Sequence, residues 1–173
     1  GQAYSQTLLN FPRILSSSER FTGIALNNPT SETATVTLTA YTPNGERLSG
    51  ANIQNPVTVR LSSASQYARL FGEIFGTNIP FDGWVQATSA SSGLTGFVLT
   101  GSTTIADFDG SIAAAPLTRS WLPLISVEGN AANEITIVNI NDEPTSATVN
   151  LYSPDGNSIS ARQIDLPSHG LYR

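Results

Sequence analysis

The sequence contains no cysteine, no methionine and no lysine, and its single histidine is His169. Without cysteine there can be no disulfide, thiolate nucleophile, cysteine-ligated zinc or iron–sulfur site. The basic residues are arginines placed singly along the chain, and the net charge is -5. Nucleic acids and anionic lipids attract clustered cations, so we expect neither as a partner. No apolar run approaches the roughly 20 residues of a membrane span, so we expect no membrane insertion.

Groups that could support catalysis are also scarce. His169 lies in "LPSHGLYR", beside Ser168 and near Asp165. Neighbouring residues on a strand point to opposite sides, so Ser168 is badly placed to give a proton to the imidazole. The G-x-S-x-G, phosphate-binding glycine-loop and H-E-x-x-H patterns are absent. We interpret His169 as an exposed loop residue and predict that the protein is not an enzyme.

The apolar residues that are present alternate with serine and threonine. In "TATVTLTAYT", Val36, Leu38 and Ala40 fall on one side and threonines on the other, which is the period of half-buried strands. "PVTVRL" and "SATVNLYS" follow the same pattern. One helix is predicted in "SQYARLFGEIFG", where Leu70, Phe71, Ile74 and Phe75 share a face. The sequence therefore predicts an all-β fold with one short helix at an end.

Much of the sequence occurs twice. "YTPNG" at residues 41–45 is echoed by "YSPDG" at residues 152–156, a separation of 111 positions. The same separation joins Pro12 to Pro123, Ile24 to Ile135, Asn28 to Asn139 and Glu32 to Glu143. Beyond the turn it becomes 105, joining Leu61 to Leu166, Ser63 to Ser168 and Tyr67 to Tyr172. A change of offset inside a loop is typical of repeats.

The repeated pentapeptide has the composition of a reversal between two strands. Proline presets φ at the second turn position, Asn or Asp tolerates the third, and glycine closes the fourth. In the second copy, the alternation of "NSISARQIDL" breaks between Ala161 and Ile164, which predicts a β-bulge there.

The segments "FTGIALNNP", "ATVTLTAYTPNG", "YARLFGEIFG", "FDGWVQATS" and "GFVLTGS" together resemble repeat modules of large secreted or surface proteins of bacteria. The resemblance implies an immunoglobulin-like or fibronectin-type-III-like β-sandwich. We expect a first full unit in residues 1–112, with residues 1–9 as an extended N-terminal strand or arm. A linker at 113–120 and a second, partial unit at 121–173 follow.

The second copy has no counterpart for the later strands of the first. A half sandwich exposes strand edges and an apolar face. Three explanations stay open: the sequence is cut inside the second repeat, all strands merge into one double sandwich, or a neighbouring subunit supplies the missing strand. The N-terminal "GQAYSQTLL" is the candidate donor for strand exchange.

Two groups of residues are candidate binding sites. Asp107 and Asp109 in "ADFDGS" resemble the opening of a calcium loop, although Thr118 stands where the loop needs a bidentate glutamate. Turn formation also explains both carboxylates. The aromatic candidates for stacking on a sugar ring are Trp84, Trp121, Tyr41 and Tyr152. Core packing is the competing interpretation for the tryptophans.

These observations favour a non-catalytic module located outside the cell or on its surface, with a role in structure, adhesion or self-assembly. We expect protein partners, either further copies or neighbouring modules, and no cofactor apart from the candidate Ca²⁺ ion. A carbohydrate-binding module with exposed aromatic residues is the alternative.

Overall fold

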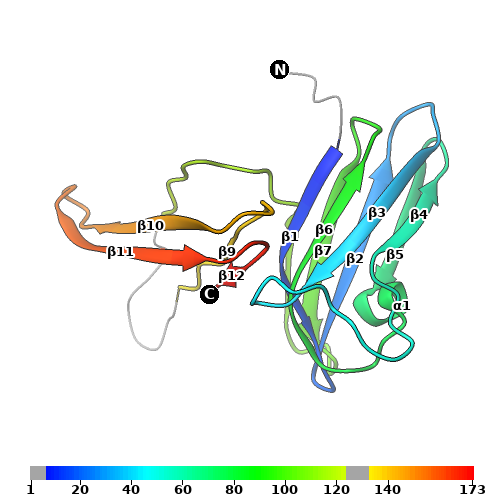
Figure 1. Ribbon diagram of the computed structural model, residues 1–173, viewed down its shortest axis with the longest axis horizontal. Coiled ribbons are helices and arrows are strands. Elements are labelled where there is room, and N and C mark those ends of the chain that lie inside the picture. Colours follow the sequence, from blue (N-terminus) through cyan, green and yellow to red (C-terminus); the bar gives the residue numbers. More distant parts are fainter. Residues whose placement is uncertain (1–6, 124–132) are drawn as a thin grey trace.

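A computed structural model describes residues 7–123 and 133–173, and within these residues the chain is almost entirely β-structure (Figure 1). The all-β prediction is confirmed. No helix in the described ranges has the length and apolar character needed to cross a bilayer. The elements are β1 (Thr7–Ser16), β2 (Arg20–Asn28), β3 (Ala34–Tyr41), β4 (Val57–Leu61), β5 (Ser65–Leu70), α1 (Phe71–Phe75), β6 (Phe81–Ser89), β7 (Thr95–Ser102), β8 (Phe108–Ile112), β9 (Ile137–Val138), β10 (Thr145–Tyr152), β11 (Ser158–Leu166) and β12 (Leu171–Tyr172).

The first eight strands form a sandwich of two antiparallel sheets, which Figure 1 shows as the larger body. One sheet has the order β1-β6-β3-β4 and the other β5-β2-β7-β8. The alternation in β3 buries Val36, Leu38 and Ala40 at no more than 1% exposure. Each strand thus contributes every second side chain to a core between the sheets. Its largest members are Phe11, Phe71, Phe75, Ile14, Ile24, Leu26 and Leu38.

The sheet order differs in part from that of an immunoglobulin sandwich. The central pairs β2–β5 and β3–β6 occupy the places of strands B–E and C–F. However, β1 lies beside β6 and β7 lies beside β2, whereas in the immunoglobulin fold the first strand lies beside the second. The structure therefore shows a β-sandwich, with the first and seventh strands exchanged relative to that order.

The predicted helix is shorter than its apolar pattern suggested. Residues 65–70 continue as strand β5, and only Phe71–Phe75 are helical. The helix begins after Leu70, whose backbone N–H donates to the Glu73 carboxylate at 2.9 Å, and ends at Gly76 in the left-handed conformation. Phe71, Ile74 and Phe75 are buried, but Leu70 is exposed because it precedes the helix.

The last four strands form two small two-stranded sheets beside the sandwich. The β10–β11 hairpin extends away from it, as Figure 1 shows. Residue pairs in this hairpin match residue pairs between β3 and β4 at the sequence offsets of 111 and 105. Thr145 pairs with Leu166, for example, as Ala34 pairs with Leu61. Likewise, Tyr172 of β12 pairs with Ile137 of β9 as Tyr67 pairs with Leu26.

The predicted bulge lies at a different place. Leu151 pairs with Ser160 and Tyr152 pairs with Ser158, so the extra residue is Ile159, next to the turn. Between Ala161 and Ile164 the register is regular, and the prediction of a bulge there was wrong. The phase break in the sequence arises because Arg162, a polar residue, occupies an inward position opposite Val149.

One buried asparagine in each half makes matching hydrogen bonds. Asn28 donates from Nδ2 to the carbonyls of Glu32, Leu61 and Ser62, and its Oδ1 accepts from the Thr30 N–H. Asn139 donates to the carbonyls of Glu143 and Pro167 and accepts from the Asn141 N–H. Their exposures are 0% and 3%. Each asparagine thus ties a strand end to the loop that crosses it.

The structure describes parts of the expected N-terminal strand or arm and of the expected linker. Residues 7–9 begin strand β1 and pair with Ser89, Thr88 and Ala87, so this part of the segment is a strand of the sandwich. Residues 1–6 lie outside the described residues. In the expected linker, the Ala114 N–H donates to the Asn10 carbonyl at 2.7 Å, which attaches its start to β1. Residues 124–132, near the start of the expected second unit, also lie outside the described residues.

We predict that Asn28→Ala lowers the free energy of unfolding by about 1–3 kcal/mol, because three carbonyls lose their donor in a buried place. Asn27→Ala, at the neighbouring exposed position, serves as the control and should change it by less than about 0.5 kcal/mol. Urea denaturation measures both. Equal effects of the two substitutions would show that the Asn28 bonds do not stabilise the fold.

Candidate assembly interface

The β10–β11 hairpin leaves exposed the residues whose counterparts form the core of the sandwich. In β3, the inward residues Val36 and Leu38 are buried. Their counterparts Ala147 and Val149 are only half-buried, and Leu151 is 38% exposed. At the base of the hairpin, by contrast, Ile164 and Leu166 are buried. Among the described residues, the outer half of the hairpin therefore has an apolar strip on β10 without a covering layer, beside Arg162 of β11.

One edge of β10 has no strand beside it. In the sandwich, β3 pairs with β4 on one edge and with β6 on the other. Among the described residues, β10 pairs with β11 alone. Its sequence "TSATVNLY" carries no charge and no proline, the two features that usually protect an edge strand. The edge is therefore open to pairing with another strand.

The two halves of the chain meet at a stack of three rings. Trp84 of β6 lies 4.9 Å from Tyr41 of β3, with 21° between the ring planes. The His169 imidazole covers the tyrosine, with centroids 4.3 Å apart and 17° between the planes. Trp84 Nε1 donates to the His169 carbonyl at 2.8 Å. The stack removes both aromatic side chains from solvent and fixes the second half against the outer face of a sheet.

His169 was predicted to be an exposed loop residue, and this prediction was wrong. Its side chain is 16% exposed, and Nε2 lies 3.0 Å from the Asp142 carboxylate. Its backbone has φ 53°, the same value as Ala64 in the corresponding loop of the first half. The ring packs against Tyr41, whereas the loop around Ala64 is exposed although its backbone has the same conformation.

The turn at residues 41–45 receives the backbone of the loop at residues 167–170. The Leu171 N–H donates to the Pro43 carbonyl at 2.8 Å. Gly45 has φ 86°, and a Cβ built on it would overlap the Ser168 carbonyl oxygen. Glycine is therefore required at position 45 for two reasons: the backbone is left-handed there, and the loop at residues 167–170 approaches closely.

Ion pairs surround this junction. Arg173 contacts Asp82 of the sandwich at 2.9 Å and Glu134 at 3.6 Å. Glu134 also lies 3.4 Å from Arg13 of β1. Most of these side chains are more than one third exposed, so each pair adds little to stability. They contribute mainly to the orientation of the second half.

Of the four aromatic candidates for sugar binding, two are buried and two are exposed. Tyr41 is 4% exposed and Trp84 is 0% exposed, so neither presents a ring face to a ligand, which corrects their assignment to an exposed platform. Trp121 is 69% exposed and Tyr152 is 41% exposed, with ring centroids 5.8 Å apart. Arg119 lies over the Trp121 ring at 5.0 Å. The structure thus brings one exposed aromatic pair together.

The two candidate calcium ligands contact arginines. Asp107 accepts two hydrogen bonds from Arg20 at 2.7 and 2.8 Å and one from the Ser102 N–H. Asp109 lies 3.5 Å from Arg13. The described part of the chain contains no group of three or more His, Asp or Glu side chains placed to hold an ion. The Arg20 hydrogen bond, followed by those of Ser102, holds the pKa of Asp107 below its usual value.

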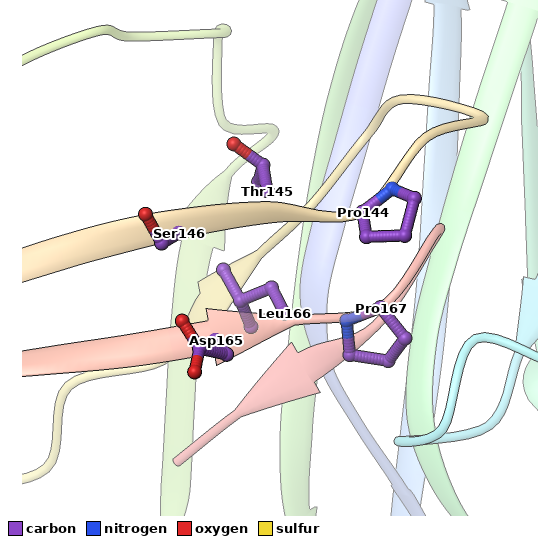
Figure 2. A pocket seen from close by; sticks show the side chains of 6 residues that line it. All are labelled: Pro144, Thr145, Ser146, Asp165, Leu166 and Pro167. Carbon is purple, nitrogen blue, oxygen red and sulfur yellow. The ribbon is translucent and has the colours of Figure 1, made fainter.

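The hollows on the surface are shallow and open. One, of about 560 Å³, lies at the base of the hairpin between Pro144, Thr145, Ser146, Asp165, Leu166 and Pro167 (Figure 2). Asp165 is the only ionisable residue that lines it. Another, of about 350 Å³, includes Arg20 and Asp82 at one end of the sandwich. Each is lined by one carboxylate, Asp165 or Asp82, so neither holds two facing carboxylates.

The contacts of the 41–45 turn were not predicted from the sequence. Its proline and glycine were assigned to the reversal of the chain alone, and nothing in the pentapeptide indicates that a second loop lies against it. One signal was present. His169 stands where the otherwise similar loop at residues 62–65 has Ala64.

Comparison with known proteins gives the fold but no activity. No family model matches the chain, and no curated protein matches it. A crystal structure from Thermotoga maritima superposes with a TM-score of 0.50 at 12% identity, covering 62% of this chain and 91% of that one. At this identity the likeness supports the fold alone.

We predict that Gly45→Ala loosens the junction and that Gly156→Ala does not. Both glycines have left-handed φ values, 86° and 81°, so both substitutions strain the turn by about 1–2 kcal/mol. Only at Gly45 must a neighbouring carbonyl, that of Ser168, also move, because no described residue lies within 4 Å of a Cβ at Gly156. Hydrogen exchange of the Leu171 amide at low protein concentration should therefore accelerate in Gly45→Ala alone. Equal exchange in the two variants would contradict the close approach.

A pH series tests the Arg20–Asp107 contact. Because the pKa of Asp107 is lower in the folded chain, the contact stabilises the fold above the ordinary Asp pKa of about 4 and is lost as pH falls through the lower folded value. Asp107→Asn should therefore lower the melting temperature at pH 7 and have no effect at strongly acidic pH. Glu32→Gln is the control. A Ca²⁺-dependent rise in the wild-type melting temperature, absent in Asp107→Asn, would instead support the calcium hypothesis.

Proposed function

We propose that this chain is a non-catalytic extracellular structural or adhesion module that associates with other protein modules through its second half. The observation that carries the proposal is the uncovered β10–β11 hairpin, with its apolar face and uncharged free edge. Exposed edges of this kind are completed by another strand or module, because unpaired N–H and C=O groups and apolar side chains favour burial.

We further propose that the two halves are copies of one repeating unit. Support comes from the matching strand pairs, the two buried asparagines and the two left-handed residues, Ala64 and His169. A unit that repeats is suited to serial assembly, because the contact between neighbours can be used again.

A location outside the cell rests on composition. A sequence without lysine, cysteine or methionine presents no thiol and no thioether to oxidation, and its polar surface is built from serine, threonine and asparagine. This composition and the resemblance to secreted repeat modules support the proposed location.

Carbohydrate binding is the second candidate function, and the exposed Trp121–Tyr152 pair favours it. Two exposed rings at 5.8 Å offer apolar faces to a pyranose, and Arg119 lies beside Trp121 for hydrogen bonds to hydroxyls. Neither ring lines the two hollows described above, which makes this a weaker case than the open edge.

We predict that the chain self-associates in a concentration-dependent manner and that a charged β10 edge weakens this association. Thr148 and Asn150 are exposed on the outer side of β10. The double substitution Thr148→Lys/Asn150→Lys gives the strand the charges that protected edges carry, and it should raise the dissociation constant at least about tenfold. Sedimentation velocity over a wide concentration range measures it. The control is Thr37→Lys/Thr39→Lys in β3, which already has a neighbour on both edges.

A wild-type chain that remains monomeric at the highest concentration would overturn the proposal of self-association. A glycan-array signal abolished by Trp121→Ala, together with a monomeric chain, would select the carbohydrate-binding function instead.

A further inference from the structure

The junction inside the chain is a template for a contact between chains. The 41–45 turn of the first half is covered by the 167–170 loop of the second half. The 152–156 turn of the second half has the same internal bonds: the Gly156 N–H donates to Ser153 as Gly45 donates to Thr42. Yet no described residue lies within 4 Å of a Cβ at Gly156. One of two equivalent turns is therefore occupied and the other is free.

A free loop that matches the occupying one is present in the first half. The loop at residues 62–65 repeats the bonds of the 167–170 loop: Ser65 N–H donates to Ser62 as Gly170 donates to Pro167. Ala64 N–H donates to the Thr30 carbonyl at 3.3 Å, as His169 donates to Asn141 at 3.2 Å. Ala64 and His169 share φ 53°. Residues 62–64 are exposed, so this loop can contact another molecule.

The free turn also has a tryptophan beside its tyrosine, although Trp121 is not the counterpart of Trp84 in the repeat and its ring is tilted at 43°. Tyr41 lies beside Trp84 at 4.9 Å, and Tyr152 lies beside Trp121 at 5.8 Å. The first pair is buried by His169, whereas the second is exposed. Within the described residues, the Pro154 carbonyl has no partner corresponding to the Leu171 N–H that binds Pro43.

We propose that the 152–156 turn of one chain binds the 62–65 loop of a second copy of the same chain. This inference rests on the proposed self-association and specifies its partner and geometry. The backbone of residue 63 in one copy takes the place over Gly156 that Ser168 takes over Gly45, and Ala64 lies over Tyr152. The Gln66 N–H, which corresponds to that of Leu171, faces the Pro154 carbonyl.

Such a contact is heterologous, because a turn binds a loop and not another turn. Each chain offers one free turn and one free loop, so association continues head to tail into an open filament or a closed ring. The charge of the two surfaces permits it: loop 62–65 carries no charge, and the turn carries only Asp155.

Substitutions at one exposed position should move the affinity in opposite directions. Ala64→His restores the ring that covers Tyr41 in the intramolecular junction, and it should tighten association about tenfold by stacking on Tyr152. Ala64→Glu places a carboxylate over the ring face and should weaken association at least about tenfold. Both substitutions keep the left-handed residue and lie outside the core, and thermal melting at low concentration checks that each variant folds.

A substitution in the 152–156 turn tests its part in the contact, and the control substitution strains the backbone at a glycine remote from both surfaces. Gly156→Ala introduces a Cβ where the second copy approaches and should raise the dissociation constant at least about tenfold. Gly76→Ala introduces a comparable backbone strain at φ 67° at the end of α1, where a Cβ would approach the Asn52 carbonyl and neither surface, and it should leave association unchanged. Sedimentation velocity measures the dissociation constants.

A mixing experiment distinguishes the head-to-tail contact from edge pairing. Gly156→Ala blocks the turn and keeps the loop, whereas Ala64→Glu blocks the loop and keeps the turn. Each variant alone should be monomeric, and an equimolar mixture should form a 1:1 dimer and nothing larger. Suppose that the wild type associates, that Thr148→Lys/Asn150→Lys abolishes the association, and that the Gly156 and Ala64 variants leave it unchanged. In that case this inference is wrong and the proposed function stands. A monomeric wild type overturns both.

Discussion

A β-strand is stable in water only when its backbone groups are paired and its apolar side chains are covered, and this constraint governs both halves of the chain. The sandwich satisfies it: β3 has β4 and β6 on its edges, and Val36 and Leu38 lie in the core. The β10–β11 hairpin keeps the same pairing but has neither the second neighbour nor the opposing layer. The stability of the hairpin therefore depends on its buried base, at Ile164 and Leu166, and on the junction with the sandwich.

The sequence contained enough to predict the strands and the turn, because period-2 alternation and the proline–glycine reversal are local signals. Offsets of 111 and 105 positions also anticipate which strands pair in the second half. The helix was overestimated because Tyr67 and Leu70 fit a helical face as well as a strand, and only pairing with β2 decides between them. The bulge was misplaced because Arg162 occupies an inward position and interrupts the apolar pattern without an extra residue.

Contacts between distant segments could not be derived in the same way. Nothing local distinguishes Trp84, which is buried beneath a loop 85 positions away, from Trp121, which is exposed. The alternation of apolar residues in β1 also does not show that β1 lies beside β6 instead of β2, because the same face of β1 would point to the core in either place. His169 was assigned to solvent because its loop is polar, whereas its ring packs against Tyr41.

In the proposed assembly, the same kind of turn–loop contact joins the two halves of one chain and also joins one chain to the next. The difference between His169 and Ala64 makes these two contacts unequal in strength. Within the chain, the loop at residues 167–170 carries a histidine that stacks on Tyr41, and the Leu171 N–H after it donates to the Pro43 carbonyl. Because this loop belongs to the same chain, its effective concentration at the 41–45 turn is high and the turn is occupied in every molecule. Between chains, the equivalent loop carries an alanine, and its contact with the 152–156 turn lacks the stacked ring. The intramolecular contact is therefore the stronger one, and a foreign loop does not displace it. The weaker contact then depends on the concentration of chains, which permits assembly at a crowded surface while dilute molecules stay separate.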